Sequence, residues 1–529
     1  MKILRILSAA LALGALGDGG LHAQAAETPR HGGTLTALVF PEPPTLTTIA
    51  HTAGSSVLMS GKVVEGLLTY DFDLTPRPQL ATEWKVSQDG LTYTFSLRQG
   101  VKWHDGKPFT SADAAHSIEL LKANHPRGRA TFAGVTAIET PDAHTLVLRL
   151  SRPAPYLLRA FAAAESPIVP KHLYAQGEAQ ANPYNNQPIG TGPYRFKEWV
   201  KGSHVIYERN PDYWDRPKPY IDRLVVRFIV DAAARTAAIE SGEVQLSAGS
   251  PVPLSEIERL KKNSRLVLET RGYEYINNVS RLEFNLENPV LKDLRVRRAI
   301  AHALDRQALL KTVWYGYGQL IAGPIASGLP EYADDLQVLP YDLNAARKLL
   351  AEAGYPGGKK PNGQPLRLKI VPVANDGAAR TAQFLKAALG RIGIRSDIFT
   401  HDFASYIQRI YTERDFDIHV SAMSNTFDPT VGVQRLYWSK NFKKGLPFSN
   451  GAGYFSAPVD RLLEQAAVEI DPKKRLAQFH EFQQHIVRDL PDITLLAFES
   501  HTVADKRVRD HTTGADGFAG NLAGVWLAE

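Results

Sequence analysis

The sequence predicts an α/β protein built of two lobes, for three reasons. The chain has 529 residues, which is too long for a single hydrophobic core. Residues 366–371, 378–391 and 394–400 alternate as strand, helix and strand, and such a βαβ unit implies a parallel sheet in the C-terminal half. Residues 188–214 form a predicted hairpin that returns the chain early to a first sheet.

Composition is that of an ordinary globular protein, with 44% hydrophobic and 22% charged residues. No apolar run reaches the roughly 18 residues needed to cross a bilayer. The net charge is +6, but Lys and Arg are spread evenly, which argues against a nucleic-acid partner. The chain contains no cysteine, which excludes disulfides, thiolate metal sites and a cysteine nucleophile.

A secretory signal peptide is expected at residues 1–25. Lys2 and Arg5 form a basic region, residues 6–16 are apolar, and residues 23–25 read Ala-Gln-Ala, a small-x-small cleavage site. The absence of cysteine also excludes a lipidated N-terminal residue. These features predict a free protein of the Gram-negative periplasm that is not lipid-anchored.

The elements of the N-terminal half follow from local patterns. Residues 32–38 are predicted as a first strand and residues 57–69 as a helix. Apolar and polar residues alternate over 91–98, a strand entered through the Asp89-Gly90 turn. Thr110 and Asp113 have the spacing of a capping box and predict a helix through residue 121.

The hairpin at 188–214 begins with a glycine turn. Gly190 and Gly192 are expected to be needed because glycine adopts positive φ. Tyr194 and Phe196 then alternate with basic residues as a strand with one buried face. A turn at residues 201–204 leads into the return strand.

The remaining elements extend the alternation of strands and helices. Strands are predicted at 221–226 and 415–420. Helices are predicted at 231–241, 294–314, 342–353 and 458–490.

Several of these stretches resemble one known family. The strings GTGPY…ERNPDYW at 190–214, WKVSQDGLTYTFSLRQGVKWHDGKPFTSAD at 84–113 and RVRRAI at 295–300 are similar to motifs of the family 5 extracytoplasmic solute-binding proteins. These proteins are the peptide- and nickel-type receptors of ABC importers. The resemblance covers about residues 32–510 and implies a large periplasmic-binding-protein-like fold of three regions, with the ligand cleft between the lobes.

The resemblance also implies a division into regions. Lobe I is expected to comprise residues 26–75, 188–284 and 500–529. An inserted subdomain is expected at 76–187, and lobe II at 285–499.

The motifs in the sequence that could indicate an enzyme are incomplete. His480, Glu481 and His485 form HExxxH, and the two histidines, five residues apart, would not converge on one zinc. There is no GxSxG elbow and no Walker spacing. His104 beside Asp105 is explained by a turn. The sequence predicts neither catalysis nor a cofactor nor a bound metal.

The ligand site is inferred from the resemblance. The segment Ser421–Pro429 matches the region where peptide binders of the family hold the ligand amine with a carboxylate. Asn425 stands at the matching position, and Ser421-Ala422 stands where a glycine-tryptophan pair is frequent. Asn cannot compensate an ammonium charge, so Asp428 is an alternative partner. The expected ligand-binding set is Thr52, Ala53, Gly54, Glu283, His419, Ala422, Met423, Asn425, Phe427, Asp428 and Trp438.

The function predicted from the resemblance is capture of a small solute, a peptide or peptide-like molecule, and its delivery to ABC permease and ATPase subunits. The expected protein is a monomer. The alternatives are a receptor for an opine, a sugar conjugate or a metal chelate. Two alternatives from other functional classes are a secreted hydrolase and a chaperone-like peptide binder of the periplasm.

Overall fold

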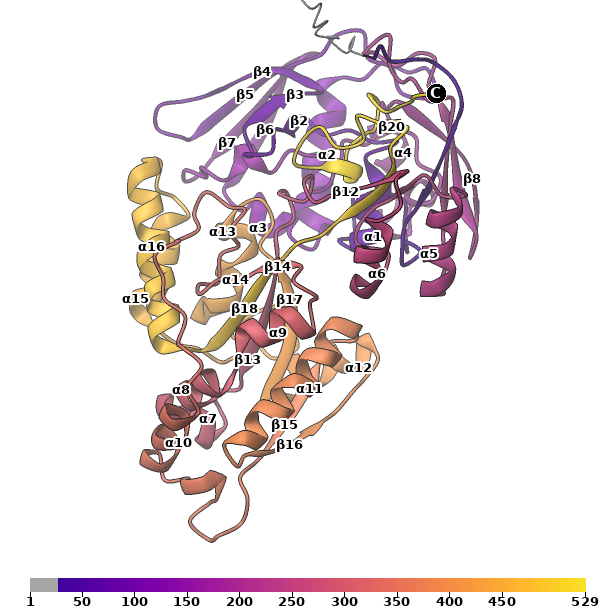
Figure 1. The fold of residues 1–529 in the computed structure, drawn as a ribbon. Coiled ribbons are helices and arrows are strands. Elements are labelled where there is room, and N and C mark those ends of the chain that lie inside the picture. The colour runs from indigo at the N-terminus through magenta and orange to yellow at the C-terminus, as the bar shows by residue number, and fades with distance from the viewer. Residues whose placement is uncertain (1–26) are drawn as a thin grey trace, which may run out of the picture.

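The computed structural model describes residues 27–529, so the predicted signal peptide lies outside the described residues. The chain forms a larger upper part and a smaller lower part (Figure 1). Each part contains its own sheet, and here lobe I means the part with the seven-stranded sheet and lobe II the part with the six-stranded sheet. The two-lobed α/β prediction is confirmed. Within residues 27–529, no helix is long and apolar enough to cross a membrane.

The sheet of lobe I has the order β12-β19-β11-β1-β10-β9-β8. Its central strand β1 pairs in parallel with β10 and β11, and the outer pairs are antiparallel. The strands are β1 (Thr34–Leu38), β8 (Tyr194–Val200), β9 (His204–Arg209), β10 (Arg223–Arg227), β11 (Leu246–Ser247), β12 (Leu266–Glu269) and β19 (Thr502–Asp505). The helices that go with this sheet are α1 (Gly54–Ser60), α5 (Ala232–Ser241) and α6 (Leu254–Leu260).

The sheet of lobe II has the order β14-β18-β13-β17-β15-β16. The predicted βαβ unit is present, because β15 and β16 pair in parallel and flank α11. The strands are β13 (Asn278–Phe284), β14 (Gly318–Gln319), β15 (Arg367–Pro372), β16 (Arg395–Ile398), β17 (Ile418–Ser424) and β18 (Asp492–Phe498). Because β13 belongs to this sheet, the predicted start of lobe II at residue 285 is one strand too late.

The helices of lobe II mostly begin at side-chain caps. The predicted helix 294–314 is two helices, because Asp305 caps the second one through its bond from the Ala308 amide (2.8 Å). The predicted helix 458–490 also divides, at Asp471 and Pro472. The helices are α7 (Pro289–Lys292), α8 (Leu294–Ala303), α9 (Arg306–Thr312), α10 (Leu343–Glu352), α11 (Asp376–Arg391), α12 (Phe403–Ile407), α13 (Pro429–Gly432), α14 (Gln434–Tyr437), α15 (Ala457–Ala466) and α16 (Pro472–Asp489).

The inserted region carries a four-stranded antiparallel sheet in the order β4-β5-β7-β6. The capping box predicted at Thr110 and Asp113 is formed at the start of α2. The elements are β4 (Ala81–Val86), β5 (Thr92–Leu97), α2 (Ser111–Asn124), α3 (Gly128–Thr131), β6 (Val135–Asp142), β7 (Thr145–Leu150) and α4 (Lys171–Tyr174). Two short pairs, β2 (Leu68–Tyr70) with β3 (Pro76–Pro78) and β20 (Val508–Arg509) with β21 (Trp526–Leu527), complete lobe I.

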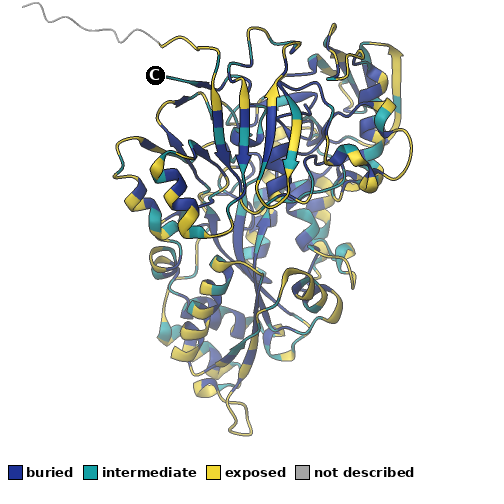
Figure 2. Cartoon of the chain, turned by 90° about the vertical axis from the view of Figure 1, so that its right-hand side faces the viewer, coloured by how far each residue is buried: buried dark blue, intermediate teal, exposed yellow. Residues whose placement is uncertain are grey.

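The chain passes between the sheets twice, between β12 and β13 and again between β18 and β19. The strands near these crossings are mostly buried (Figure 2). The main hydrophobic core continues across the junction, since it contains Tyr70 and Phe161 of lobe I as well as Phe427 and Phe479 of lobe II. The lobes are therefore in contact in this structure.

Glu65 explains much of the sequence signature at 188–214. This carboxylate is fully buried and accepts hydrogen bonds from Thr191 Oγ1 (2.9 Å), Tyr213 Oη (2.8 Å) and Trp214 Nε1 (2.9 Å). Asn521 Nδ2 adds a fourth donor at 3.3 Å. Burial raises the pKa of Glu65 above its ordinary value, although these donors oppose the shift. Residues of the signature therefore surround a buried hydrogen-bond acceptor, the Glu65 carboxylate, in lobe I.

The glycines of the signature are required for a reason other than the predicted one. Neither Gly190 nor Gly192 adopts positive φ. A Cβ on Gly190 would instead lie 1.8 Å from Val63 O, and one on Gly192 would lie 2.7 Å from it. The close approach lets the Gly192 amide donate to Val63 O at 2.9 Å.

Replacing Glu65 with alanine is expected to lower the free energy of unfolding by at least about 3 kcal/mol, since each buried donor left without an acceptor costs about 1–3 kcal/mol. Urea denaturation followed by circular dichroism measures this loss. Glu83→Ala, at an exposed glutamate of β4, is the matched control and should change little. Equal stability of the two variants would contradict the role given to Glu65.

Candidate functional site

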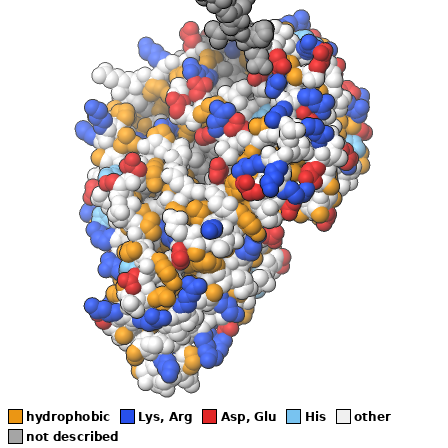
Figure 3. All heavy atoms as spheres, in the orientation of Figure 1, with side chains coloured by type: hydrophobic (Ala, Val, Ile, Leu, Met, Phe, Trp, Pro, Cys, Tyr) orange, Lys and Arg blue, Asp and Glu red, His pale blue; other side chains and the backbone are white. Residues whose placement is uncertain are grey.

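A cavity of about 400 Å³ lies where the lobes meet, and we refer to it as the interlobe cleft. Lobe I contributes the loop before α1 and the first turns of that helix, and lobe II contributes the end of β17 and the loop after it. Figure 3 shows hydrophobic side chains gathered around the junction of the two parts. The lining residues are Phe40, Pro41, Thr52, Ala53, Gly54, Ser55, Val57, Leu58, Arg127, Ala164, Glu165, Gly249, Tyr273, Tyr275, Ile276, Asn278, Ser424, Thr426, Phe427 and Ser500.

Four residues of the expected ligand set line this cleft: Thr52, Ala53, Gly54 and Phe427. The structure places the other seven outside the lining: Glu283, His419, Ala422, Met423, Asn425, Asp428 and Trp438. Most of the residues that the resemblance suggested therefore lie outside the lining of the interlobe cleft.

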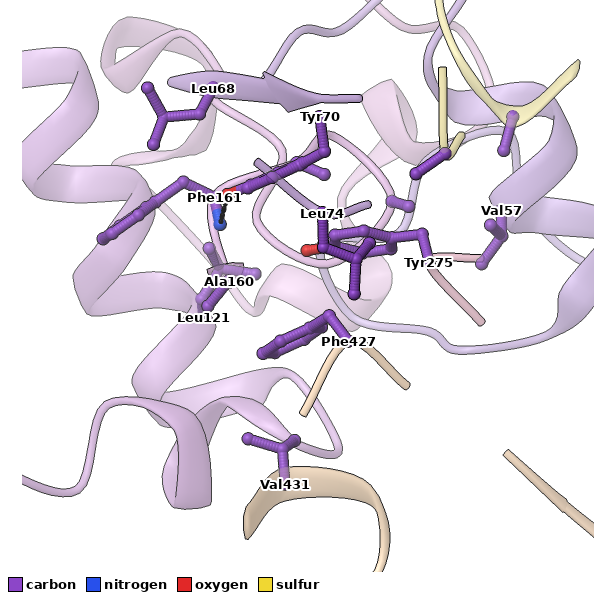
Figure 4. Packing of buried hydrophobic residues seen from close by; sticks show 14 of the residues in the cluster. Val57, Leu68, Tyr70, Leu74, Leu121, Ala160, Phe161, Tyr275, Phe427 and Val431 are labelled. Atoms are coloured by element: carbon purple, nitrogen blue, oxygen red, sulfur yellow. Dashed lines mark hydrogen bonds between the residues drawn. The ribbon is translucent and has the colours of Figure 1, made fainter. Parts of the chain in front are cut away.

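Aromatic rings form one wall of the cleft. Tyr275, in the first crossing segment, stacks on Phe427 with ring centroids 5.2 Å apart (Figure 4). The Tyr275 hydroxyl donates to Arg159 O at 2.6 Å, which fixes the ring. Tyr273 is held by its hydroxyl, which lies 2.7 Å from Thr502 Oγ1 and accepts from the Gly249 amide at 2.9 Å. Phe427 is fully buried and Tyr275 nearly so, so the partly exposed ring of Tyr273 is the aromatic surface of this wall that a ligand can contact.

Arg127 and Glu165 are the charged residues of the cleft lining. Arg127 Nε donates to Glu165 Oε2 at 2.9 Å, and Nη2 of the same guanidinium also contacts that oxygen. The Glu165 side chain is only 2% exposed, whereas that of Arg127 is 22% exposed. Burial by itself would raise the pKa of Glu165, but the Arg127 guanidinium outweighs it and holds this pKa below its ordinary value. Glu165 is therefore an ionised carboxylate whose charge is already compensated.

Asn425 is fully buried beneath the cleft. Its side-chain oxygen accepts the Ala326 amide at 2.6 Å, while its Nδ2 has no partner among the described residues. The oxygen that the resemblance would have offered to a ligand amine thus already accepts a hydrogen bond from the backbone.

Asp428 is also fully buried and belongs to a group of four charges. It caps α13 by accepting the Thr430 amide at 2.9 Å and pairs with Arg475 Nη2 at 2.7 Å. Glu331 accepts from Arg475 Nη1 at 3.0 Å. Arg159, from lobe I, lies 2.9 Å from Glu331 and 3.5 Å from Asp428. Two arginines balance two carboxylates, and one of the arginines comes from the other lobe.

Glu283 and His419 lie together inside lobe II. His419 Nε2 is 2.8 Å from Glu283 Oε2, and His419 Nδ1 is 2.9 Å from the Tyr406 hydroxyl. Arg281 contacts the same Glu283 carboxylate and lies 3.5 Å from Asp492. Burial raises the pKa of Glu283, but Arg281 and His419 outweigh it and lower this pKa to about 2. All five side chains of this buried polar cluster are at most 3% exposed.

The other predicted residues surround the end of β17. Ala422 and Met423 lie in that strand, opposite Ser280 and Val279 of β13. Trp438 follows α14, and its Nε1 donates to Glu464 at 2.8 Å near the surface of lobe II.

A second cavity of about 390 Å³ adjoins the cleft around the crossing segments. The two share Tyr273, Ile276, Asn278 and Ser500. This hinge cavity contains Glu274 and Glu499, and Glu274 accepts the Gly272 and Tyr273 amides at 2.8 and 3.0 Å. A larger cavity of about 530 Å³ lies within lobe I, away from the contact between lobes.

Sequence reasoning missed Arg127, Glu165, Tyr273 and Tyr275. They lie in the inserted region and in the first crossing segment, and no local pattern in the sequence distinguishes them. Within residues 27–529, no group of three or more His, Cys, Asp or Glu side chains could hold a metal. The cleft offers aromatic surface, hydroxyls and one ion pair, an arrangement suited to binding a solute.

The chain is similar to known solute-binding proteins. Residues 75–445 match the family described as "Bacterial extracellular solute-binding proteins, family 5 Middle". The dipeptide-binding protein of Escherichia coli is 28% identical over 463 residues, with 83% of each chain covered. The structure of the periplasmic binding protein DppA of Helicobacter pylori with the peptide STSA matches with a TM-score of 0.81 and 26% identity, over 94% of this chain and 99% of the other.

A protein with a different ligand is similar to this chain as well. The structure of the binding protein AgaA from Agrobacterium tumefaciens R10 with agropinic acid matches with a TM-score of 0.77 and 27% identity, over 94% of this chain and 99% of the other. Because the matched region covers well over half of the sequence, and both lobes match solved binding proteins, the chain belongs to the family 5 bacterial extracellular solute-binding proteins.

Proposed function

We propose that this protein is the periplasmic binding component of an ABC importer and that it captures a small peptide-like solute in the interlobe cleft. The observation that carries the proposal is the cavity of about 400 Å³ lined by both lobes. A solute held there contacts both parts of the molecule, so its binding energy favours the closed arrangement. The closed form, as a monomer, is then recognised by the membrane permease, and the solute is released without chemical change.

The peptide-like character of the solute is supported by the relatives named for dipeptides and peptides. A second candidate is a dedicated receptor for one non-peptide solute such as an opine, a sugar conjugate or a metal chelate. The similarity to the protein bound to agropinic acid supports this candidate.

Native mass spectrometry of the purified protein tests the proposal, before and after mild unfolding that releases a bound solute. The expected result is an adduct that leaves with its mass unchanged. Adducts spaced by amino-acid residue masses indicate a peptide receptor, and a single discrete mass indicates a dedicated one.

A variant that fills the cleft provides the matching test of location. Gly54→Trp places a bulky ring where a Cβ meets nothing within 4 Å, in the lining of the cleft. We expect this variant to lose the adduct and keep its melting temperature. Gly390→Trp is the control, because it adds the same ring to an equally open glycine of α11, outside the cleft. An adduct retained in Gly54→Trp and lost in Gly390→Trp would contradict the site.

A further inference from the structure

The charges around the interlobe cleft indicate which charged groups the solute carries. An ammonium group enclosed in a cleft needs a carboxylate that is still free to pair with it, because an unpaired buried charge is costly. Glu165, the carboxylate of the lining, is 2% exposed and is held by Nε and Nη2 of Arg127. Its charge is already compensated by Arg127.

The two positions that the family resemblance suggested for an ammonium group are also occupied. Asn425 is neutral, and its oxygen accepts the Ala326 amide at 2.6 Å. Asp428 is neutralised by Arg475 at 2.7 Å and by Arg159 at 3.5 Å. The guanidinium of Arg159, which lobe I supplies, takes the place beside Asp428 that a ligand ammonium would need.

The cleft lining carries one positive and one negative charge, but the Arg127 guanidinium has a donor that Glu165 does not use. Arg127 uses Nε and Nη2 for Glu165, and its Nη1 donates no hydrogen bond to a described residue. Arg435 of lobe II donates to Phe448 O at 2.7 Å and to Gly432 O at 3.1 Å, and its Nη2 lies 3.5 Å from the carbonyl of Ser424, a lining residue. Across the described residues, no carboxylate lies within 4 Å of Arg435.

Arg127 and Arg435 influence one another across the junction. Burial, and next the positive charge of Arg127, lower the pKa of Arg435 to about 10. Glu165 pairs directly with Arg127 alone, so an added anion near both guanidinium groups would be stabilised by both.

We propose that the solute carries a carboxylate that pairs with Arg127, in the field of Arg435, and has no free α-ammonium. An N-acylated amino acid or an N-blocked short peptide has this chemistry. Its apolar part would lie against the partly exposed ring of Tyr273 in the same lining. This inference rests on the proposed function, since it concerns the solute of the same cleft.

The test compares three probes that differ only at their ends: N-acetyl-Ala-Phe, Ala-Phe with a free amine, and N-acetyl-Ala-Phe amide. Binding is measured by isothermal titration calorimetry on full-length mature protein freed of solute by unfolding and refolding. The acetylated acid is expected to bind at least tenfold more tightly than Ala-Phe, and the amide at least tenfold more weakly than the acid. Equal or tighter binding of Ala-Phe would overturn the inference and leave the proposed function standing.

Variants of the ion pair identify the anion site. Arg127→Gln alone leaves Glu165 buried without a partner, so the double variant Arg127→Gln/Glu165→Gln removes both charges together. We expect it to melt near the wild-type temperature and to bind the acetylated acid at least tenfold more weakly. The control, Arg129→Gln, alters an exposed arginine of α3 and should bind as the wild type does. Unchanged affinity in the double variant would overturn the role of Arg127.

Pooled libraries separate this inference from the proposed function. Native mass spectrometry is run with one library of free di- and tripeptides and with the same library after N-acetylation. Selection of acetylated members supports the inference, and selection of free members overturns it alone. Absence of adducts from both libraries would overturn the proposed peptide-like solute together with the inference.

Discussion

Replacing Arg475 with leucine is expected to lower the free energy of unfolding by about 3–5 kcal/mol, the usual cost of removing one partner from a buried ion pair. Arg475 donates to Asp428 at 2.7 Å and to Glu331 at 3.0 Å, and both carboxylates are almost completely buried. Without Arg475, they share only Arg159. Urea denaturation at pH 7 measures the loss.

The matched control is Arg367→Leu, which removes an arginine that is 57% exposed and pairs with Asp397 at 2.6 Å. It should change the free energy of unfolding little, because solvent screens such a pair. Adding Glu331→Gln to Arg475→Leu removes the excess negative charge and should restore part of the stability. If Arg475→Leu were as stable as Arg367→Leu, the four charges would not be coupled as described.

Replacing Arg281 with leucine is the second change with a large expected effect, again about 3–5 kcal/mol at pH 7.5. The variant leaves Glu283 and Asp492 buried without their shared guanidinium. Its stability should then depend on pH in a characteristic direction. Without Arg281, burial favours the protonated carboxyl groups, so lowering the pH from 7.5 to 5 should make the variant more stable.

Glu283 in the wild-type protein has the opposite dependence. Its folded pKa of about 2 is below the ordinary value of 4.5, so its contribution is present above pH 4.5 and is lost as the pH falls toward 2. Between pH 7.5 and 5, the contribution of Glu283 to the stability of the wild type is therefore fully present and does not change with pH. Urea titrations at both pH values compare the two proteins. A variant that loses stability at pH 5 relative to pH 7.5 would contradict this account.

Local patterns in the sequence were sufficient to predict most helices and strands of the fold. The capping box at Thr110, the hairpin of β8 and β9 and the βαβ unit around α11 all form where periodicity and turn residues predicted them. These features depend on neighbours in the sequence. The division of the long predicted helices could also have been read from Asp305 and from Asp471-Pro472, which are good helix starts.

The candidate site was predictable only in part. Thr52 to Gly54 and Phe427 line the cleft as expected. The alignment could not show that Asp428 is neutralised by Arg159, because that contact joins two lobes through residues far apart in the sequence. Nor could it show that Ala326 occupies the Asn425 oxygen, or that Arg127 and Glu165 face the cleft. Contacts of this kind depend on how the lobes are arranged.

The central claim, that a solute brings the two lobes together, is tested most directly by single-molecule energy transfer between them. The chain contains no cysteine, so a dye that reacts with thiols attaches only to introduced cysteines. Cysteines are introduced at two exposed residues, Lys197 of lobe I and Lys360 of lobe II. With solute recovered from the native protein, the distribution is expected to move to one high-transfer state, and Gly54→Trp should abolish the response. A distribution that the bound solute leaves unchanged would contradict closure around the interlobe cleft.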